Sequence, residues 1–187
     1  MRKSKKIILS GLLLSLYIIL ARFVSFKSQI FVISFSFIPV IISAILLGPK
    51  YSKLIAGLGD FLGATLFPFG SYFVGFTIIE LITGYLYGIF LYNDDDKEEK
   101  DQTENISHSF YKGKQLIFRL IISSFINLII IGIFITGLMI SKLYGQAFVL
   151  VLSSRAITKV IMLFVQVIVI SLLNKTIIKY SEKYLLD

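Results

Sequence analysis

Two cations and two carboxylates stand out inside stretches of sequence that are otherwise apolar. Arg155 and Lys159 stand four positions apart in RAITK, so on a helix both side chains point to the same face. Asp60 and Glu80 are the only carboxylates within the hydrophobic stretches. Because a charge inside a membrane is costly unless it is paired or faces water or a ligand, these residues predict one of two arrangements. One is an internal ion-pair network, and the other is a polar pocket that binds an anionic ligand.

Aromatic residues stand beside one of these carboxylates, in the segment GDFLGATLFPFGSYFVGFT from Gly59 to Thr77. The break at Pro68 and Gly70 must pack on protein or lie at the membrane interface, because unpaired backbone donors cannot face lipid. Aromatic belts at interfaces have the same composition. Because charged residues that point inward are predicted nearby, the rings would also suit a flat conjugated ligand whose acidic tail is held by cations. The aromatic candidates are Phe67, Phe69, Tyr72 and Phe76.

Membrane-spanning helices must position these side chains. Hydrophobic residues make up 56% of the 187 residues and form long uninterrupted runs, which is typical of a polytopic helical membrane protein. We predict an all-α integral membrane protein, a six-transmembrane-helix bundle in one domain, residues 1–187. The third span is the weakest, because it is shorter than the roughly 20 residues needed to cross a bilayer. The predicted spans are residues 7–25, 31–47, 54–67, 72–92, 116–141 and 147–173.

Basic residues predict the orientation of this bundle. Near the ends of the spans and between them, they gather before the first span, at Lys50 and Lys53, in the linker 93–115, and after the last span. The opposite side holds only Arg22, Lys27 and Lys142. Positive charge is retained in the cytoplasm, so both termini are predicted to be cytoplasmic, with a cytoplasmic linker at 93–115. A basic face on anionic lipid accounts for the net charge of +8, and no nucleic-acid partner is expected.

The sequence lacks the residues that several kinds of catalytic or metal site require. The chain has no cysteine and a single histidine, His108, in a polar loop, so thiolate sites, histidine-based zinc sites and Ser-His triads are not expected. We therefore predict no catalytic residues, no metal site, no cofactor and no enzymatic activity. A membrane lipid-modifying enzyme stays open as an alternative. Its metal would need Asp94–Asp96, in an acidic segment that is more typical of a solvated linker.

A string of motifs covers most of the chain beyond the first span. It comprises a Gly-Pro turn, GD-x-x-G, LFP-x-G-x-YF-x-GFT, and a later YG-x-AF followed by R-x-x-x-K. This pattern resembles the folate-specific S-components, the substrate-binding subunits of energy-coupling factor (ECF) vitamin transporters. The resemblance implies six helices, high-affinity capture of one vitamin at the external face, and no chemistry. It also implies a multi-pass protein of a prokaryotic plasma membrane, driven by an ECF transmembrane coupling protein and two cytoplasmic ATPases.

The resemblance also implies roles for individual residues. A pterin-like ring stacks among the aromatic candidates, with Asp60 or Asn127 facing its amino and amide edge. Arg155 and Lys159, together with Arg22, attract the carboxylates. Glu80 alternatively holds Arg155 when the site is empty. Gly11 and Ser15 form a small-xxx-small pair that suits docking of a partner helix, or ordinary packing within the bundle.

One departure from the family leaves specificity open. The second span reads VISFSFIPV and lacks the glycine-rich, arginine-bearing stretch that relatives often carry before this point. The glutamate end of a folate is therefore expected to be held differently. An S-component for another vitamin, such as thiamine, riboflavin or pyridoxine, remains an alternative.

Overall fold

The computed structural model of the protein describes residues 3–27, 32–68, 72–92, 113–145 and 148–185. Most of the described residues are helical, which confirms the predicted all-helical class. Two sequence predictions lie outside the described residues. These are the position of Phe69 and that of nearly all of the linker predicted at 93–115.

The helices follow one another with short connections. A two-residue antiparallel pairing, with Phe26 opposite Ile33, forms a hairpin between the first two helices. The segments α5, η2 and α6 continue into one another without a break, so they form one composite helix. The elements are α1 (Lys3–Arg22), β1 (Phe26–Lys27), β2 (Val32–Ile33), α2 (Phe37–Leu47), α3 (Pro49–Leu66), α4 (Val74–Leu91), α5 (Gly113–Ile126), the π-helix η2 (Asn127–Ile135), α6 (Thr136–Tyr144) and α7 (Phe148–Leu185).

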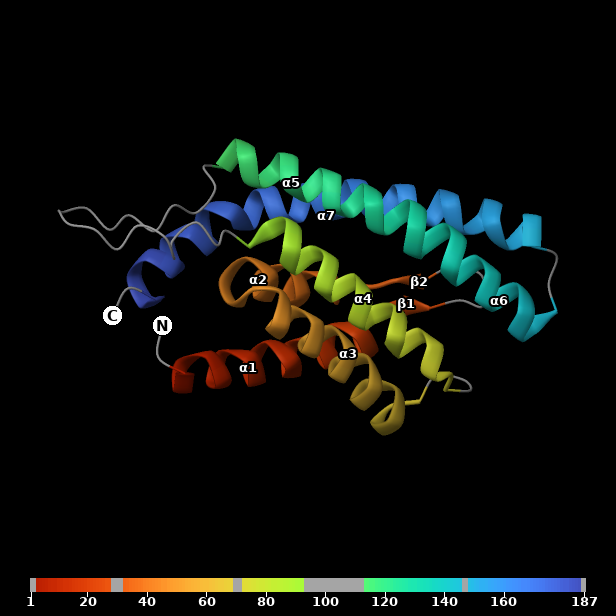
Figure 1. The fold of residues 1–187 in the computed structure, drawn as a ribbon, viewed down its shortest axis with the longest axis horizontal. Helices are drawn as coiled ribbons and strands as arrows, with labels where there is room; N and C mark the ends of the chain where they lie inside the picture. The colour runs from red at the N-terminus through yellow and green to blue at the C-terminus, as the bar shows by residue number, and fades with distance from the viewer. Residues whose placement is uncertain (1–2, 28–31, 69–71, 93–112, 146–147, 186–187) are drawn as a thin grey trace.

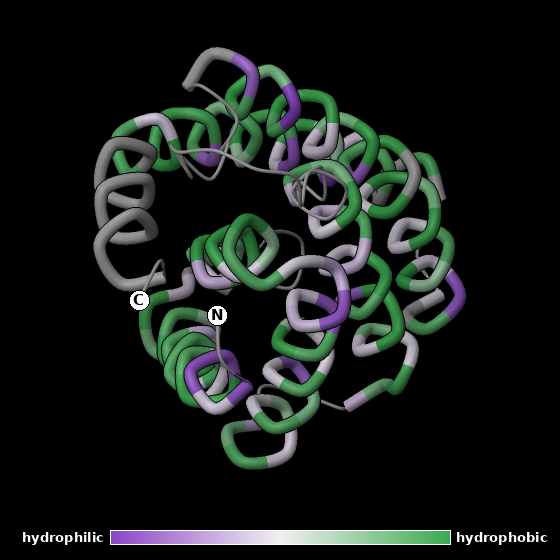
Figure 2. The backbone as a smooth tube through the Cα atoms, turned by 60° about the vertical axis from the view of Figure 1, so that its left-hand side comes forward, coloured by the Kyte–Doolittle hydropathy of each residue, from purple (hydrophilic) through white to green (hydrophobic). Residues whose placement is uncertain are grey.

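Within the part of the chain that the structure describes, four helical segments are long and apolar enough to cross a membrane. They are α1, α4, the stretch Gln115–Leu143 of the composite helix, and Arg155–Leu173 of α7. Figure 2 shows the hydrophobic colouring that dominates these helices. The helix α2 has only 11 residues, and α3 is less apolar. A helical membrane protein is therefore confirmed, whereas six spans and the membrane orientation stay predictions.

Both ends of the chain lie at the same end of the bundle (Figure 1), which we call the terminal end. The opposite end carries the β1–β2 hairpin, the start of α4 and the start of α7, and we call it the hairpin end. The helix α2 lies inside the bundle, with most of its residues buried. The centre of the core comprises Ile41, Ala44, Ala56, Leu91, Leu116, Leu120 and Ile170.

The helices α3 and α4 pack with their backbones in close contact. A β-carbon added at Gly88 would overlap with Pro49, and one added at Gly84 would meet the backbone of Ser52. The Ser52 Oγ donates to the Gly84 carbonyl across this interface at 2.8 Å. Gly48, at a positive φ of 83°, turns the chain sharply before α3 starts at Pro49. These contacts fix α4, which carries much of the site described next.

Candidate functional site

The charged residues of α7 face the inside of the bundle. Its exposed apolar residues recur at helical spacing and mark the face that points outward: Ile157, Val160, Ile161, Phe164 and Ile168. Arg155, Lys159 and Gln166 lie on the opposite face, as the period of 3.6 residues requires. Many protein atoms lie around Lys159, but they do not cover its side chain, part of whose surface remains accessible to solvent. Lys159 therefore lines an accessible space within the bundle, which we call the inner space.

The helix α4 presents a second polar stripe to this space. Its exposed apolar residues again mark the outward face: Val74, Ile78, Ile82 and Ile89. Phe76, Glu80 and Tyr87 lie on the other side of the helix, at spacings of four and seven residues. The stripes of α4 and α7 thus both point toward the interior of the bundle.

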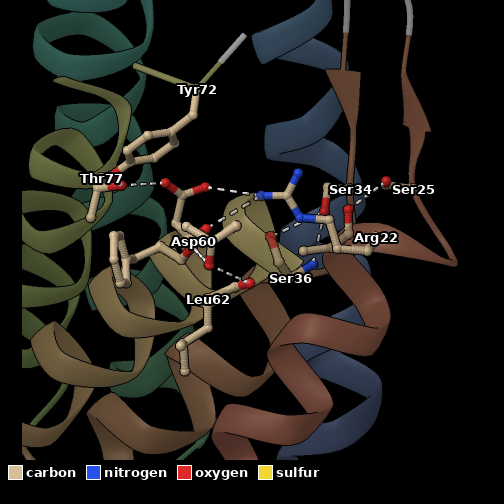
Figure 3. A network of polar contacts seen from close by, with 11 residues as sticks. Arg22, Ser25, Ser34, Ser36, Asp60, Leu62, Tyr72 and Thr77 are labelled. Atoms are coloured by element: carbon tan, nitrogen blue, oxygen red, sulfur yellow. Dashed lines mark hydrogen bonds and ion pairs between the residues drawn. The ribbon is translucent and has the colours of Figure 1, made fainter. Parts of the chain in front are cut away.

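At the hairpin end, a network of polar side chains connects α1, α3 and α4 (Figure 3). The Arg22 guanidinium lies 3.6 Å from the Asp60 carboxylate, and it donates to the Asp60 backbone carbonyl at 3.3 Å. Thr77 Oγ1 donates to the other Asp60 oxygen at 2.8 Å. The Tyr72 hydroxyl lies 2.9 Å from Thr77 Oγ1. Arg22 lies close against α3, because Gly63 leaves room for it.

Glu80 interacts with a different cation. Lys159 attracts it across the inner space, and the Tyr17 side chain lies near its carboxylate. Tyr17 is only 3% exposed and packs on α3 at Gly59. Lys159 is thus the cation whose charge acts on Glu80 among the described residues, whereas the sequence hypothesis paired Glu80 with Arg155.

Arg155 makes no ion pair with any carboxylate that the structure describes. It lies one helical turn from Lys159, which carries the same charge. At the level of the inner space near the hairpin end, the described groups named above are three cations, Arg22, Lys159 and Arg155, and two carboxylates, Asp60 and Glu80; the part-buried Arg119 lies on α5 and donates to the Phe90 carbonyl. One positive charge is left over in the inner space, near the hairpin end.

A second polar group lies farther toward the terminal end, and we call it the deep polar cluster: Tyr87, Ser124, Asn127 and Gln166. The Tyr87 hydroxyl donates to Gln166 Oε1 at 3.2 Å and lies 3.4 Å from Ser124 Oγ. Asn127 is 7% exposed. Neither its amide nitrogen nor its amide oxygen has a hydrogen-bond partner among the described residues.

The predicted aromatic residues are divided between the surface and the interior. Phe67 is 44% exposed and Tyr72 is 38% exposed, at the hairpin end. Phe67 packs edge-on against Phe23, and Tyr72 against Phe61. Phe76 lies on the inward face of α4 and contacts Phe73. Phe67 and Tyr72 therefore lie exposed at the hairpin end, whereas Phe76 lies on the inward face of α4.

The structure thus brings Arg22, Asp60 and Tyr72 into one network and Glu80 and Lys159 into another, and it places Asn127 apart from both. Sequence reasoning missed Tyr17, Tyr87, Ser124 and Gln166. A signal for two of them was present, because Tyr87 follows Glu80, and Gln166 follows Lys159, by seven residues on one helix face. The described residues contain no group of three His, Cys, Asp or Glu that would hold a metal.

Comparisons with known proteins agree on one family. The family described as "ECF transporter, substrate-specific component" matches residues 5–174. A folate transporter FolT of Leuconostoc mesenteroides subsp. mesenteroides is 26% identical over 186 residues, with 96% of this chain and 90% of the relative covered.

A folate transporter FolT of Clostridium novyi (strain NT) is 37% identical over 93 residues. That match spans about half of each protein, 50% of this chain and 54% of the relative. Among solved structures, a crystal structure of FolT bound with folic acid superposes with a TM-score of 0.75 at 28% identity. It covers 94% of this chain and 97% of that one.

Proposed function

Because the chain belongs to the family of ECF transporter substrate-specific components, we propose that it is the subunit that captures folate for an ECF transporter. Family membership confirms the resemblance found in the sequence motifs. It makes the protein a transporter component and not an enzyme. Folate as the ligand rests on the FolT relatives and on the charge of the site.

The surplus positive charge of the inner space carries this proposal. Arg155 has no carboxylate partner among the described residues, and an unpaired charge within a membrane protein marks a functional site. A folate carries carboxylates on its glutamate end. A guanidinium binds a carboxylate through two parallel hydrogen bonds, which gives both affinity and orientation.

The remaining inward residues take supporting roles in this proposal. Glu80 neutralises Lys159 while the site is empty, and the ligand's carboxylate competes with it when bound. Arg22 and Asp60 hold the hairpin end of the site together, and Arg22 Nη2 already uses the Asp60 carbonyl. Phe76 packs against the ligand, while Phe67 and Tyr72 form the mouth through which it enters.

We further propose that the protein spans the plasma membrane of a bacterium six times, with both termini in the cytoplasm. The helices α2 and α3 supply the two spans that length and apolarity alone do not identify. The shared location of the two termini (Figure 1) supports this topology, because it requires an even number of crossings. The hairpin end then faces outward, where the vitamin is captured.

A transport assay tests the proposed function in the assembled system. Proteoliposomes that contain this protein with an ECF coupling protein and its two ATPases should accumulate labelled folic acid when ATP is enclosed. Accumulation should stop without ATP or without this subunit. Uptake of thiamine, riboflavin or pyridoxine in place of folic acid would keep the transporter class and refute folate as the ligand.

The docking surface for the coupling protein is proposed on α1. A β-carbon at Gly11 would meet nothing within 4 Å, and Ser15 directs its hydroxyl to the Gly11 carbonyl at 3.0 Å. The surface at this pair is therefore shallow, and the Ser15 hydroxyl already has a hydrogen-bond partner. A partner helix can approach such a surface closely. Exposed apolar residues surround it: Ile7, Ile8, Leu12 and Ile19.

The Gly11→Leu variant should separate docking from ligand binding. We expect folate uptake to fall by about tenfold or more, because the leucine side chain holds the partner helix away. Folate affinity of the isolated variant should equal that of the wild type, since Gly11 contacts no other part of the bundle. Gly11→Ala, which keeps the residue small, is the control. Wild-type uptake by Gly11→Leu would refute docking at this pair.

A further inference from the structure

The helices α3 and α4 run antiparallel, and the line along which they meet reaches the outer surface of the bundle. Lys53 of α3 meets Tyr85 of α4 near the terminal end. Phe61 of α3 meets Tyr72, just before α4, near the hairpin end. All four of these side chains are exposed, and we call this outward line of contact the α3–α4 seam. Further exposed apolar residues flank it: Leu54, Ile78, Ile82 and Ile89.

Lys53 is a surface cation that has an aromatic neighbour and no acidic one among the described residues. Its ammonium lies 5.9 Å from the centre of the Tyr85 ring, near the outer limit of a cation–π contact. No carboxylate that the structure describes forms an ion pair with it. An ammonium carries three hydrogen-bond donors, and the ring lies on only one side of it. Tyr85 therefore positions the lysine, whose donors remain able to bind an anion.

The depth of this pair matches the level of lipid headgroups. Lys53 stands four residues after the start of α3 at Pro49, about 6 Å along the helix. Tyr85 stands six residues before the end of α4 at Leu91, about 9 Å along a helix that is long and apolar enough to cross a membrane. A lysine at this depth extends its stem toward the interface, where tyrosine is also enriched. Lys50, exposed one turn earlier, adds a second positive charge.

Charge and apolarity together select the occupant of the α3–α4 seam. A phospholipid brings a phosphate for the lysines and acyl chains for the apolar residues beside them, whereas a free phosphate would match only the lysines. The acidic segment 93–105 of the chain would match the lysines too, but it contains no apolar residue that could cover the exposed isoleucines. In a zwitterionic lipid, the cation of the headgroup offsets the phosphate. An anionic phospholipid therefore fits the seam best.

We propose that the α3–α4 seam binds an anionic phospholipid at the terminal end of the bundle. Lys53 and Lys50 hold the phosphate, Tyr85 positions Lys53, and one acyl chain follows the seam toward Phe61. Phe61 follows Lys53 by eight residues, about 12 Å of helix, which is less than the roughly 15 Å of hydrocarbon in one leaflet. The seam lies on the outside of the bundle, apart from the inner space, so the inference does not depend on which vitamin the protein binds.

Native mass spectrometry of the purified protein tests the site with two lipids of identical acyl chains, phosphatidylglycerol and phosphatidylcholine. We expect the wild type to bind its first phosphatidylglycerol more tightly than phosphatidylcholine. Lys53→Ala should weaken the binding of that phosphatidylglycerol by about fivefold, the effect of one lysine near an anionic lipid, and should leave phosphatidylcholine binding unchanged. Lys53→Arg, which keeps the charge, should bind as the wild type does. Tyr85→Leu should lie between the wild type and Lys53→Ala, because the lysine keeps its charge and loses its positioning.

Lys5→Ala is the matched control, since Lys5 is an exposed lysine of α1 at the same end of the bundle. Its affinity for phosphatidylglycerol should stay within about twofold of the wild type, because an exposed charge away from the site contributes little. An equal loss in Lys5→Ala and Lys53→Ala would show diffuse attraction by basic residues and would overturn the site. Equal binding of the two lipids by the wild type would overturn it as well.

Two further outcomes would assign the seam to another occupant. Displacement of the lipid by inorganic phosphate alone would show that the lysines bind phosphate without help from the acyl chains, and would overturn the phospholipid site. A Lys53→Ala protein that binds phosphatidylglycerol normally but fails to assemble with an ECF coupling protein would make the seam a protein interface, which would also overturn the proposal.

Discussion

The Arg155→Ala variant is expected to lose high-affinity folate binding and to remain folded. Removing one partner of a buried charge pair costs about 2–5 kcal/mol, so we expect affinity to fall by about 30-fold or more. The fold should survive because Arg155 makes no ion pair with a described carboxylate, and its removal strands no buried charge. Calorimetric titration with folic acid, together with a thermal unfolding curve in detergent, measures both effects.

Two further variants make this result specific. Arg155→Lys keeps the charge and loses the planar fork of donors, so its affinity should lie between those of the wild type and the alanine variant. Lys53→Ala removes a cation near the start of α3, where the side chain lies 5.9 Å from the Tyr85 ring centroid, and should bind folic acid normally. Normal affinity of a folded Arg155→Ala protein would contradict the role given to Arg155.

The Gly88→Leu variant should fail to fold. The added β-carbon would overlap with Pro49 and would lie 2.6 Å from Ser52 Oγ, so α4 would have to move away from α3. Moving α4 would also break the hydrogen bond from Ser52 to Gly84. Overpacking of a tight core site costs about 1–3 kcal/mol or more, and here the backbone itself is in the way. We expect a large loss of monodisperse protein in size-exclusion chromatography and a clear fall in melting temperature.

The same substitution at Gly11 is the control for this prediction. Both glycines lie within helices, so the change in helix propensity is comparable. Only Gly88 lies against another helix, whereas a β-carbon at Gly11 has open space. A Gly88→Leu protein that is as stable as Gly11→Leu would show that the contact between α3 and α4 is not tight.

Much of this arrangement is predictable from the sequence, because charges in apolar helices have few permitted positions. The cost of facing lipid requires Arg155, Lys159, Asp60 and Glu80 to point inward, and the structure places all four there. The helices themselves follow from the length and apolarity of the runs. The Gly-Pro turn also identifies the start of α3, where Gly48 adopts a positive φ.

The pairing of these charges is not predictable in the same way. Asp60 pairs with Arg22 of α1, and Glu80 lies toward Lys159 of α7. Which cation each carboxylate meets depends on how the helices are rotated relative to one another. That rotation follows from contacts such as Tyr17 on Gly59 and Arg22 on Gly63. The π-helical start at Asn127 has no sequence signature either, since η2 is uniformly apolar after its first residue.

The most direct test of the central claim is calorimetric titration of the purified protein with folic acid, with thiamine, riboflavin and pyridoxine as competitors. We expect one-to-one binding of folic acid in the nanomolar range that none of the three competitors displaces. Tight binding of one of the other vitamins in place of folic acid would contradict the assignment of the ligand. Binding of none of them would leave the inward charges as a structural network and would contradict the account as a whole.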